Sequence, residues 1–538
     1  MTIELHGISD AGGRQHLTEL VQDQFARRLF ERDATLWGEA AEAEAAVRLG
    51  WTDVSGLGEL IEEIATLRAE LNARGINRVV LCGMGGSSLA PAVIRRWAGV
   101  DIEIVDSTHP DVMRRALGAD LNRTVVVVSS KSGGTIETRS HRAAFTAAFE
   151  AAGFNPADHI VIVTDPGSPL EVEARAAGLR VFLADPNVGG RFSALTAFGL
   201  VPSGLAGADL HALLNDASAA REELRVDSAS NPALQLAAWL AAGLPASPVL
   251  GVLQGDDAQW DLGDWIEQLI AESTGKNGLG VLPIALADAA PEVRATPANM
   301  RLVRVCSLTA DDADDRIVEV CAPLGAQLLL WETATAALGR LLGIDPFNQP
   351  DVESAKIAAR EQLDQAAVPA PARALIGFPG VSVLERRDEI SVLVPGTPPS
   401  TPADLVARLR DMVTPDGYVS IQAYLDPEGP YASALEELRD ALATYLGVPV
   451  ALGWGPRYLH STGQLHKGGP ALGTFVQLLD SPSAPLEIPG TQNDFNTLIA
   501  AQARGAREVL GARGRPVLAL ECDDPGEAAR RLVTALRA

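Results

Sequence analysis

The sequence contains few cysteines and lacks any long apolar run. Its four cysteines, Cys82, Cys306, Cys321 and Cys522, stand singly, without a CxxC pair or a histidine at metal-ligand spacing. This pattern excludes a disulfide-rich scaffold and a cysteine-based zinc site, so we expect four reduced, mostly buried thiols and no bound metal. No segment approaches the ~18 consecutive apolar residues of a membrane span, and the start, MTIELHGISDAGGRQ, lacks the regions of a signal peptide. We therefore predict a cytoplasmic protein with no membrane partner.

Positive charge is also scarce. The chain has 44 basic against 69 acidic residues, and its formal net charge is −25. This balance argues against nucleic acid as a partner, because nucleic acid binds a basic face. Only Lys131, Lys276, Lys356 and Lys467 are lysines. Since a surface cation can be either residue, we infer that lysine is kept where a compact ammonium does what a planar guanidinium cannot; chance placement stays open for any one of them.

Length and apolar content predict several compact units. At ~150 residues per domain, 538 residues correspond to three or four units. Runs such as TVVVVSS and HIVIVTD alternate with helical segments, which indicates parallel sheets covered by helices on both faces. The predicted fold is α/β, with an N-terminal helical region, two doubly wound parallel-sheet units and a third α/β unit. The predicted bounds are 1–75 for the helical region, 76–215 and 216–365 for the two sheet units, 366–374 for a proline-containing linker and 375–538 for the last unit.

The last unit loosely repeats an earlier segment. The stretch PLEIPGTQNDFNTLIAAQARGAREVLGARGRP echoes DRIVEVCAPLGAQLLLWETATAALGRLLGIDP. This echo suggests that the third unit is a duplicated copy of the same fold.

A glycine-rich turn follows the first predicted strand. In VVLCGMGGSSLAP, residues Gly83, Gly85, Gly86 and Ser87 lie between a strand and the start of a helix. Backbone N–H groups left free there, together with the positive end of the helix, can hold an anion. The alternative is a merely tight turn. The spacing differs from the GxGxxG of dinucleotide sites, and the turn lacks the GK[ST] ending of a P-loop.

A second turn, SSKSGGTIET, gathers hydroxyl groups, glycines and a rare lysine at another helix start. Ser130, Ser132 and Thr135 can surround a phosphate group while Lys131 neutralises its charge. A helix N-cap with incidental serines would explain one of these hydroxyls, but it explains the cluster poorly. The turn therefore predicts a phosphate site.

These turns and three further motifs resemble one family. GMGGSS and SSKSGGTIET resemble the phosphosugar-binding turns of SIS (sugar isomerase) domains, which implies that the two sheet units are SIS-type domains. PNVGGRFSALTAFGL resembles the glucose-6-phosphate isomerase signature around its active-site arginine, here Arg191. AESTGKNG resembles the loop with the catalytic glutamate, here Glu272. FNQPDVESAK resembles the motif that carries Gln349 and Lys356, and the matches follow the family order over roughly residues 77 to 360.

The active-site histidine of the family matches an unusual place. RYLHSTGQLHKGG resembles the family's LHS-x-GQ motif and puts the histidine at His460, whereas most members carry it shortly after the catalytic glutamate. In the usual enzyme this histidine comes from the neighbouring subunit of a dimer. Our hypothesis is that the third unit imitates that subunit and supplies His460 within one chain, as in the isomerase half of bifunctional transaldolase/glucose-6-phosphate isomerase proteins. His466 and Lys467 of this segment have no assigned role.

The resemblance implies an aldose–ketose isomerase that needs no cofactor or metal and acts on a small-molecule sugar phosphate. Glu272 would move a proton between neighbouring carbons, and Arg191 would stabilise the enediolate. His460 and Lys356 would open the sugar ring while Gln349 orients it. The phosphate would be held by Gly86, Ser87, Ser130, Lys131, Ser132 and Thr135. A monomer is expected if His460 acts within its own chain, and a homodimer otherwise.

Two alternatives remain. An isomerase of the same fold could act on mannose 6-phosphate, or on both sugars. A non-catalytic SIS protein that senses phosphosugars would need the two turns but not Glu272, Arg191 and Lys356 together. Such a sensor would usually carry a basic DNA-binding module, which the acidic balance disfavours.

Overall fold

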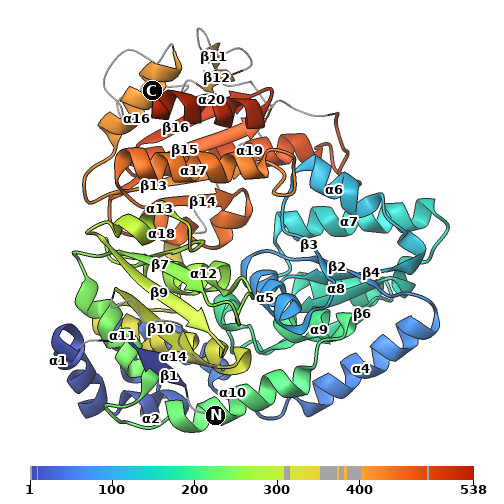
Figure 1. Cartoon of the computed structure of the whole chain (residues 1–538). Helices are drawn as coiled ribbons and strands as arrows, with labels where there is room; N and C mark the ends of the chain where they lie inside the picture. Colours follow the sequence, from blue (N-terminus) through green and yellow to red (C-terminus); the bar gives the residue numbers. More distant parts are fainter. Residues whose placement is uncertain are drawn as a thin grey trace.

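The computed structural model describes residues 3–8, 10–307, 316–351, 372–374, 381–384, 401–480 and 484–538. In these ranges the chain folds into three β-sheets with helices packed against them (Figure 1). The first two sheets lie side by side, and the third unit lies across both (Figure 1). The predicted α/β class with parallel sheets is confirmed, while the number of domains stays a prediction.

The first sheet is fully parallel, with the order β3-β2-β4-β5-β6. Its central strands are continuous Val and Ile runs because helices cover both faces, so no position faces water. The predicted boundary at residue 215 falls inside the next helix, α10 (Leu210–Leu224). The strands are β2 (Arg78–Cys82), β3 (Glu103–Val105), β4 (Thr124–Ser129), β5 (Ile160–Thr164) and β6 (Arg180–Leu183), and the helices are α5 (Leu89–Ala98), α6 (Pro110–Leu117), α7 (Ile136–Ala151), α8 (Pro169–Ala176) and α9 (Ala197–Ala206).

The second sheet has the order β1-β10-β9-β7-β8 and is parallel except for β1 (Glu4–His6), which pairs antiparallel with β10. The expectation of helices alone before residue 76 misses β1, because a three-residue edge strand is too short to show an alternating pattern. The other strands are β7 (Val249–Gln254), β8 (Leu282–Ala285), β9 (Met300–Cys306) and β10 (Ile317–Cys321). The helices are α1 (Asp10–Gln22), α2 (Phe25–Phe30), α3 (Glu39–Ala45), α4 (Gly58–Ala73), α10 (Leu210–Leu224), α11 (Pro232–Gly243), α12 (Leu262–Thr274), α13 (Pro291–Ala295) and α14 (Leu324–Leu342).

The third sheet has the order β11-β12-β16-β15-β13-β14, and its last four strands are parallel. The end of the predicted linker, Ala372–Ala374, forms the edge strand β11; the earlier linker residues lie outside the described ranges. The remaining strands are β12 (Val381–Leu384), β13 (Tyr418–Tyr424), β14 (Val450–Trp454), β15 (Gly473–Asp480) and β16 (Val517–Cys522). The helices are α16 (Pro402–Met412), α17 (Ala432–Leu446), α18 (Gly463–Gly468), α19 (Phe495–Ala512) and α20 (Pro525–Arg537).

All three sheets share one strand order. Counted along the chain, the parallel strands of each unit lie in the order second, first, third, fourth. The strands are β3-β2-β4-β5 in the first sheet, β8-β7-β9-β10 in the second and β14-β13-β15-β16 in the third. A common order is what a duplicated fold would produce, and it agrees with the echo between the second and third units. In sheets of this kind ligands bind where the order reverses, at the carboxyl ends of the strands. In the first sheet that point lies between β2 and β4, the two strands followed by the predicted phosphate turns.

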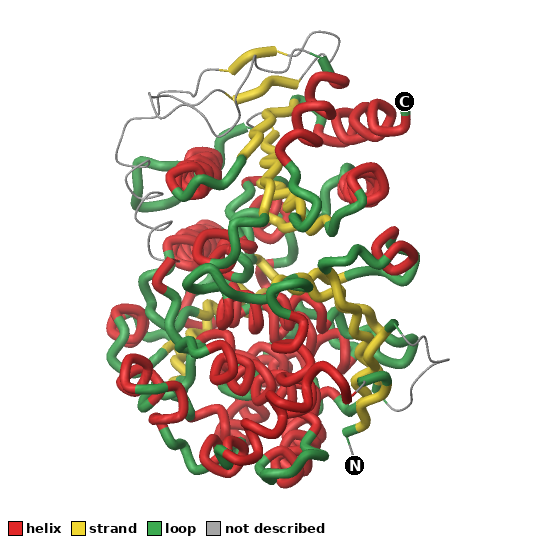
Figure 2. The backbone as a smooth tube through the Cα atoms, turned by 90° about the vertical axis from the view of Figure 1, so that its left-hand side faces the viewer, coloured by secondary structure: helices red, strands yellow, loops and turns green. Residues whose placement is uncertain are grey.

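The hydrophobic cores tie the third unit to the other two. It has its own core, from Leu405 to Leu536, but Phe495 packs into the first unit and Phe475 packs against the second. Helices flank the strands of each layer (Figure 2). No helix in the described ranges combines the length and apolar character that crossing a membrane requires.

The prediction of four reduced thiols is wrong for two cysteines. Cys306 and Cys321 end the neighbouring parallel strands β9 and β10 in register, with their Cα atoms 4.4 Å apart, and they form a disulfide. Cys82 and Cys522 are free and buried. Strand register brings the pair together, and register cannot be read from single cysteines in the sequence.

We expect two reactive thiols in unfolded, unreduced protein and four after reduction. The disulfide closes a segment with a sequence separation of 15 residues, so replacing both Cys306 and Cys321 by serine should lower the free energy of unfolding. For a loop of this length the expected loss is about 3 kcal/mol. Thiol titration and denaturant unfolding measure the two effects. Four reactive thiols without reductant would contradict the pairing.

Candidate active site

Arg191 and Glu272 form a buried ion pair. Glu272 lies near the end of α12, and its Oε1 is 3.0 Å from Nη1 of Arg191. Both side chains are less than one-tenth exposed. The structure therefore joins two of the predicted catalytic residues, which come from different units, in one contact.

The Arg191 guanidinium is fixed by hydrogen bonds on every nitrogen. Nε donates to Ser273 Oγ at 2.7 Å, and Nη2 donates to the carbonyl oxygens of Pro346 and Asn348. Nη1 also donates to Oε1 of Gln349 at 3.0 Å, which brings a third predicted residue into the cluster. Burial lowers the pKa of Arg191, and the charge of Glu272 opposes this shift. The cation is thus held in one place beside the carboxylate.

The first glycine turn packs tightly against these residues. A Cβ at Gly86 would lie 1.9 Å from the carbonyl oxygen of Gly190, the residue before Arg191. Gly85 has a φ of +56°, and a Cβ there would lie 2.7 Å from the carbonyl oxygen of His460. Only glycine allows both approaches. The expectation that the turn leaves its N–H groups free is wrong for Ser87 and Ser88, whose N–H groups donate to carbonyls within the turn.

The second turn brings the predicted phosphate ligands together. Ser130 Oγ donates to Thr135 Oγ1 at 3.2 Å, and Ser132 Oγ accepts from the N–H of Gly134. Thr135 precedes the first turn of α7, whose unpaired N–H groups make that helix end a favourable place for an anion. Nζ of Lys131 lies 2.5 Å from Oδ2 of Asp165, a carboxylate that the sequence analysis did not single out.

His460 lies between all three units. Its Nε2 is 3.1 Å from Oε1 of Glu137, in the first turn of α7, and its backbone carbonyl accepts from Nε2 of Gln268 in α12. The same Gln268 nitrogen donates to Oε2 of Glu272 at 3.1 Å. One amide group thus links the His460 segment to Glu272, and the link is made within a single chain.

Glu137 is a candidate functional residue that the sequence analysis missed. Burial raises its pKa, but the charge of His460 and the hydrogen bond to it outweigh burial, so the net pKa is lowered. Glu137 also accepts from Nε2 of Gln502 in α19. Because an ionised carboxylate only accepts, Nε2 of His460 is the donor in this contact, and Nδ1 is left for another partner. Glu137 stands inside the quoted SSKSGGTIET, but only folding shows that its partner lies 323 residues away.

Replacing Glu137 by glutamine is expected to lower kcat for a cyclic substrate. The loss should be about 10²-fold, the lower end of what general acid–base catalysis contributes. The reason is that the His460 imidazole loses the negative charge that fixes its tautomer. KM should change little, since Glu137 makes no contact with the phosphate turn's hydroxyls in the described structure. Steady-state kinetics measure both.

Glu150→Gln is the matched control, because Glu150 is exposed at the other end of the same helix. Its kinetics should equal those of the unmodified protein. Equal kcat values for the two variants would show that Glu137 does not act on His460.

Helix α18 of the third unit holds the ends of two segments near the cluster. Gln464 is fully buried, and its Nε2 donates to the carbonyl of Gly275, just after α12, and to Oδ2 of Asp351. Its Oε1 accepts the N–H of Asp351. Gly275 approaches α18 so closely that a Cβ would lie 2.3 Å from the Cα of Leu465. These contacts fix the positions of the Glu272 helix and the Gln349 segment relative to the third unit.

Lys276, Lys467 and His466 each make a hydrogen bond within the described residues. Lys276 donates to the carbonyl of Asp345, and burial, with the nearby Arg191, lowers its pKa to about 6. Lys467 donates to the carbonyl of Asp351. Nδ1 of His466 is 3.0 Å from the Tyr418 hydroxyl, and burial lowers its pKa to about 3, so the ring is neutral. Lys356 lies outside the described residues.

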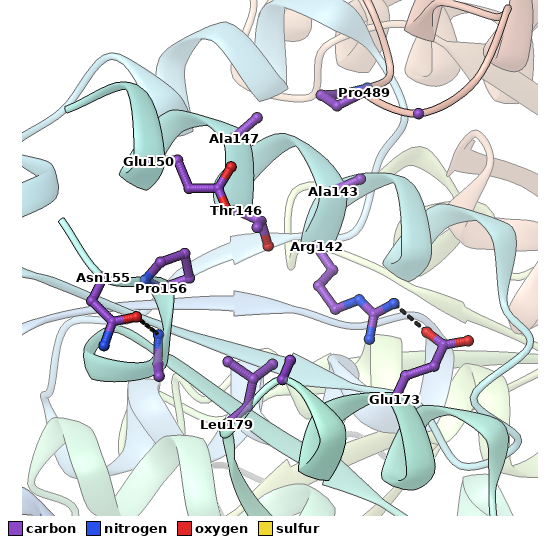
Figure 3. A pocket seen from close by; sticks show the side chains of 13 residues that line it. Arg142, Ala143, Thr146, Ala147, Glu150, Asn155, Pro156, Glu173, Leu179 and Pro489 are labelled. Carbon is purple, nitrogen blue, oxygen red and sulfur yellow. Dashed lines mark hydrogen bonds and ion pairs between the residues drawn. The ribbon is translucent and has the colours of Figure 1, made fainter. Parts of the chain in front are cut away.

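A separate hollow of about 570 Å³ is lined by residues of α7 and α8 and by Pro489 (Figure 3). Arg142 and Glu173 in its lining form an ion pair, and Glu150 also belongs to the lining (Figure 3). None of the predicted site residues belongs to its lining. The candidate active site is therefore defined by the Arg191–Glu272 contact and not by this hollow.

Curated relatives match this chain over part of its length. A protein named glucose-6-phosphate isomerase from Cyanothece sp. is 35% identical over 238 residues, which cover 40% of this chain and 45% of the relative. Proteins of the same name from Synechococcus sp. and Thermus thermophilus are 38% and 35% identical over 291 and 243 residues, covering 48% and 44% of this chain and 55% and 58% of the relatives. The chain thus spans about half the length of the curated relatives it matches. No family model matches the sequence.

Two solved structures share the fold. A hypothetical protein from Thermus thermophilus superposes with a TM-score of 0.58 at 27% identity, over 67% of this chain and all of that one. A glucose-6-phosphate isomerase from Chlamydia trachomatis superposes with a TM-score of 0.54 at 19% identity, over 65% of this chain and 85% of that one.

The doubly wound sheets and these superpositions place the chain among α/β proteins and show that it shares its fold with both solved structures. The sequence matches show that the chain is a homologue of proteins named glucose-6-phosphate isomerase. The family resemblance inferred from the motifs is therefore confirmed. The finer likeness to the isomerase half of bifunctional proteins stays a prediction.

Proposed function

We propose that this chain interconverts glucose 6-phosphate and fructose 6-phosphate as an aldose–ketose isomerase. The observation that carries the proposal is the buried contact of Glu272 with Arg191, linked through Gln268 to the His460 segment. It brings a carboxylate and a fixed cation next to a histidine, beside the first glycine turn. The names of the homologues support the same reaction.

Proton transfer between the two carbons would fall to Glu272. The carboxylate takes the proton from C2 of the open aldose and returns it to C1, so one group within reach of both carbons suffices. The enediolate between the two transfers carries negative charge on its oxygens. Arg191 is fixed at 3.0 Å from the base, so its positive charge lies next to the group that transfers the proton and can stabilise this charge.

Ring opening needs a proton removed from the hydroxyl at C1 and another delivered to the ring oxygen. His460 is suited to one of these transfers, because Glu137 fixes its ring and leaves Nδ1 to exchange a proton. We assign Lys356 to the other transfer by family resemblance. Gln349, held by Arg191, would orient the sugar.

The phosphate group would bind at the second turn. Ser130, Ser132 and Thr135 offer hydroxyl groups, Lys131 offers charge, and the start of α7 adds N–H donors. At the first turn, Gly86 and the Ser87 hydroxyl would complete the site. Binding energy gained at this remote group positions the reacting carbons over Glu272.

Because His460 and Glu272 meet within one chain, we propose that a monomer is active. We also propose a cytoplasmic location, because a sugar phosphate is charged and does not cross a membrane unaided.

The test is an assay of the purified chain with fructose 6-phosphate, in which an added NADP-dependent dehydrogenase oxidises the glucose 6-phosphate formed. A parallel arm supplies mannose 6-phosphate, coupled through a separate glucose-6-phosphate isomerase. Turnover of fructose 6-phosphate alone is expected. Turnover of mannose 6-phosphate alone, or of neither sugar, would contradict the proposal.

A further inference from the structure

Asp165 lies beside the second turn, SSKSGGTIET, and contacts the ammonium group of Lys131. It follows β5, the strand next to β4, and the carboxyl ends of these parallel strands meet at the same edge of the sheet. Its Oδ2 is 2.5 Å from Nζ of Lys131, and its N–H donates to the carbonyl of Lys131 at 3.4 Å. Thr164 Oγ1, at the end of the strand, donates to the carbonyl of Ser130, so both residues are tied to the turn.

Lys131 is the nearest positive charge to the partly buried Asp165 carboxylate. Its side chain is 17% exposed, and Oδ1 is buried without a hydrogen-bond partner among the described residues. Burial raises the pKa of Asp165, while Lys131 and the more distant Arg48 oppose the shift and Asp185 adds to it. A carboxylate in this position holds the ammonium strongly, because little else compensates its charge.

We propose that Asp165 sets the affinity of the turn for phosphate by competing for Lys131. A phosphate bound at Ser130 and Thr135 must share the ammonium with a carboxylate of the same sign as itself. The turn therefore binds the phosphate group more weakly than its own donors would allow, and the product leaves more readily. This inference rests on the proposed function, because it names how the substrate site of that reaction is tuned.

Weaker phosphate binding suits a reversible isomerase. Both sugars carry the same phosphate group, so tighter binding at the turn stabilises substrate, transition state and product alike. Such uniform binding lowers KM without raising kcat. A carboxylate that weakens the grip on phosphate keeps the site from being blocked by product or by free phosphate.

The test replaces Asp165 by asparagine and measures binding of inorganic phosphate by calorimetry. Loss of the competing charge should tighten phosphate binding about fivefold or more, the effect of one moderately strong ion pair. KM for fructose 6-phosphate should fall by a similar factor, and kcat should not rise. Equal or weaker phosphate binding in the variant would overturn the proposal, because Asp165 would then only hold Lys131 in place.

Asp158→Asn is the matched control. Asp158 precedes the same strand, about 20 Å away at its other end, and pairs with Arg74 at 3.3 Å on the surface. The Asp158→Asn substitution removes the same charge from the same unit. The phosphate affinity of this variant should equal that of the unmodified protein. Equal tightening in both variants would point to net charge instead of Asp165.

Two outcomes separate this inference from the proposed function. Tighter phosphate binding in Asp165→Asn without turnover of either sugar in the unmodified protein would uphold the inference and reject the reaction. Turnover with unaltered phosphate binding would do the reverse. Asp165→Ser, which also removes the charge, replaces the first variant if circular dichroism shows that asparagine prevents folding.

Discussion

Replacing Glu272 by glutamine is expected to lower kcat for fructose 6-phosphate by about 10²–10⁴-fold, the contribution of a general base. Glutamine keeps the shape of the side chain and cannot take the proton from carbon. The fold should survive, because an amide oxygen can still accept from Arg191. Only the hydrogen bond from Gln268 to this side chain is lost, because Nε2 of Gln268 still donates to the His460 carbonyl.

Sugar-phosphate binding should persist in the Glu272 variant, because the hydroxyls and charge of the phosphate turn are untouched. Calorimetry with fructose 6-phosphate measures the binding, and the coupled assay measures the rate. Residual turnover within tenfold of the unmodified protein would remove Glu272 from the mechanism.

Glu267→Gln is a demanding control on the same helix. Burial, together with the nearby Asp264, raises the pKa of Glu267 to about 8, so near neutral pH its carboxyl group is largely protonated. A neutral amide replaces a neutral acid and can still accept from Ser461 Oγ, as Glu267 does at 3.2 Å. Activity at neutral pH should therefore change little. The two substitutions are chemically identical and differ only in which carboxyl group they remove.

Replacing His460 by alanine is the second change with a large expected effect. Ring opening loses its proton carrier, so kcat for the cyclic sugar should fall by about 10²-fold or more. His211→Ala, at an exposed position of α10, should leave the rate unchanged. A His460 variant with nearly normal kcat would disprove the assignment of the histidine to the third unit.

A complementation experiment tests whether His460 serves its own chain. The His460→Ala and Glu272→Gln variants are co-expressed with different tags and purified together. If each site is complete within one chain, as the Gln268 bridge indicates, the mixture has no more activity than its parts. Recovered activity would mean that His460 reaches the site of another chain.

Motifs in the sequence are enough to name most of the candidate site residues. Arg191, Glu272 and Gln349 lie in such motifs. In the structure Arg191 contacts both Glu272 and Gln349, each at 3.0 Å. The phosphate turns follow β2 and β4, the two strands between which the order of the first sheet reverses. The roles of these residues stay predictions until the variants are measured.

What the sequence could not supply depends on contacts between distant segments. Glu137 resembles any acidic residue in the first turn of a helix until His460 folds against it. Asp165 reaches Lys131 because β5 pairs with β4 in a fixed register. The disulfide forms because β9 and β10 pair in register. Strand β9 shows no continuous apolar run in the sequence, because two arginines interrupt it in MRLVRVC.

The covalent connection of the third unit to the other two has a consequence at low protein concentration. A site shared between subunits comes apart when the subunits dissociate on dilution. Here the His460 segment is held at the Glu272 helix by the chain itself, so its local concentration at the site does not depend on how many molecules surround it. The rate per molecule should then be the same in a crowded cell and in a highly dilute assay.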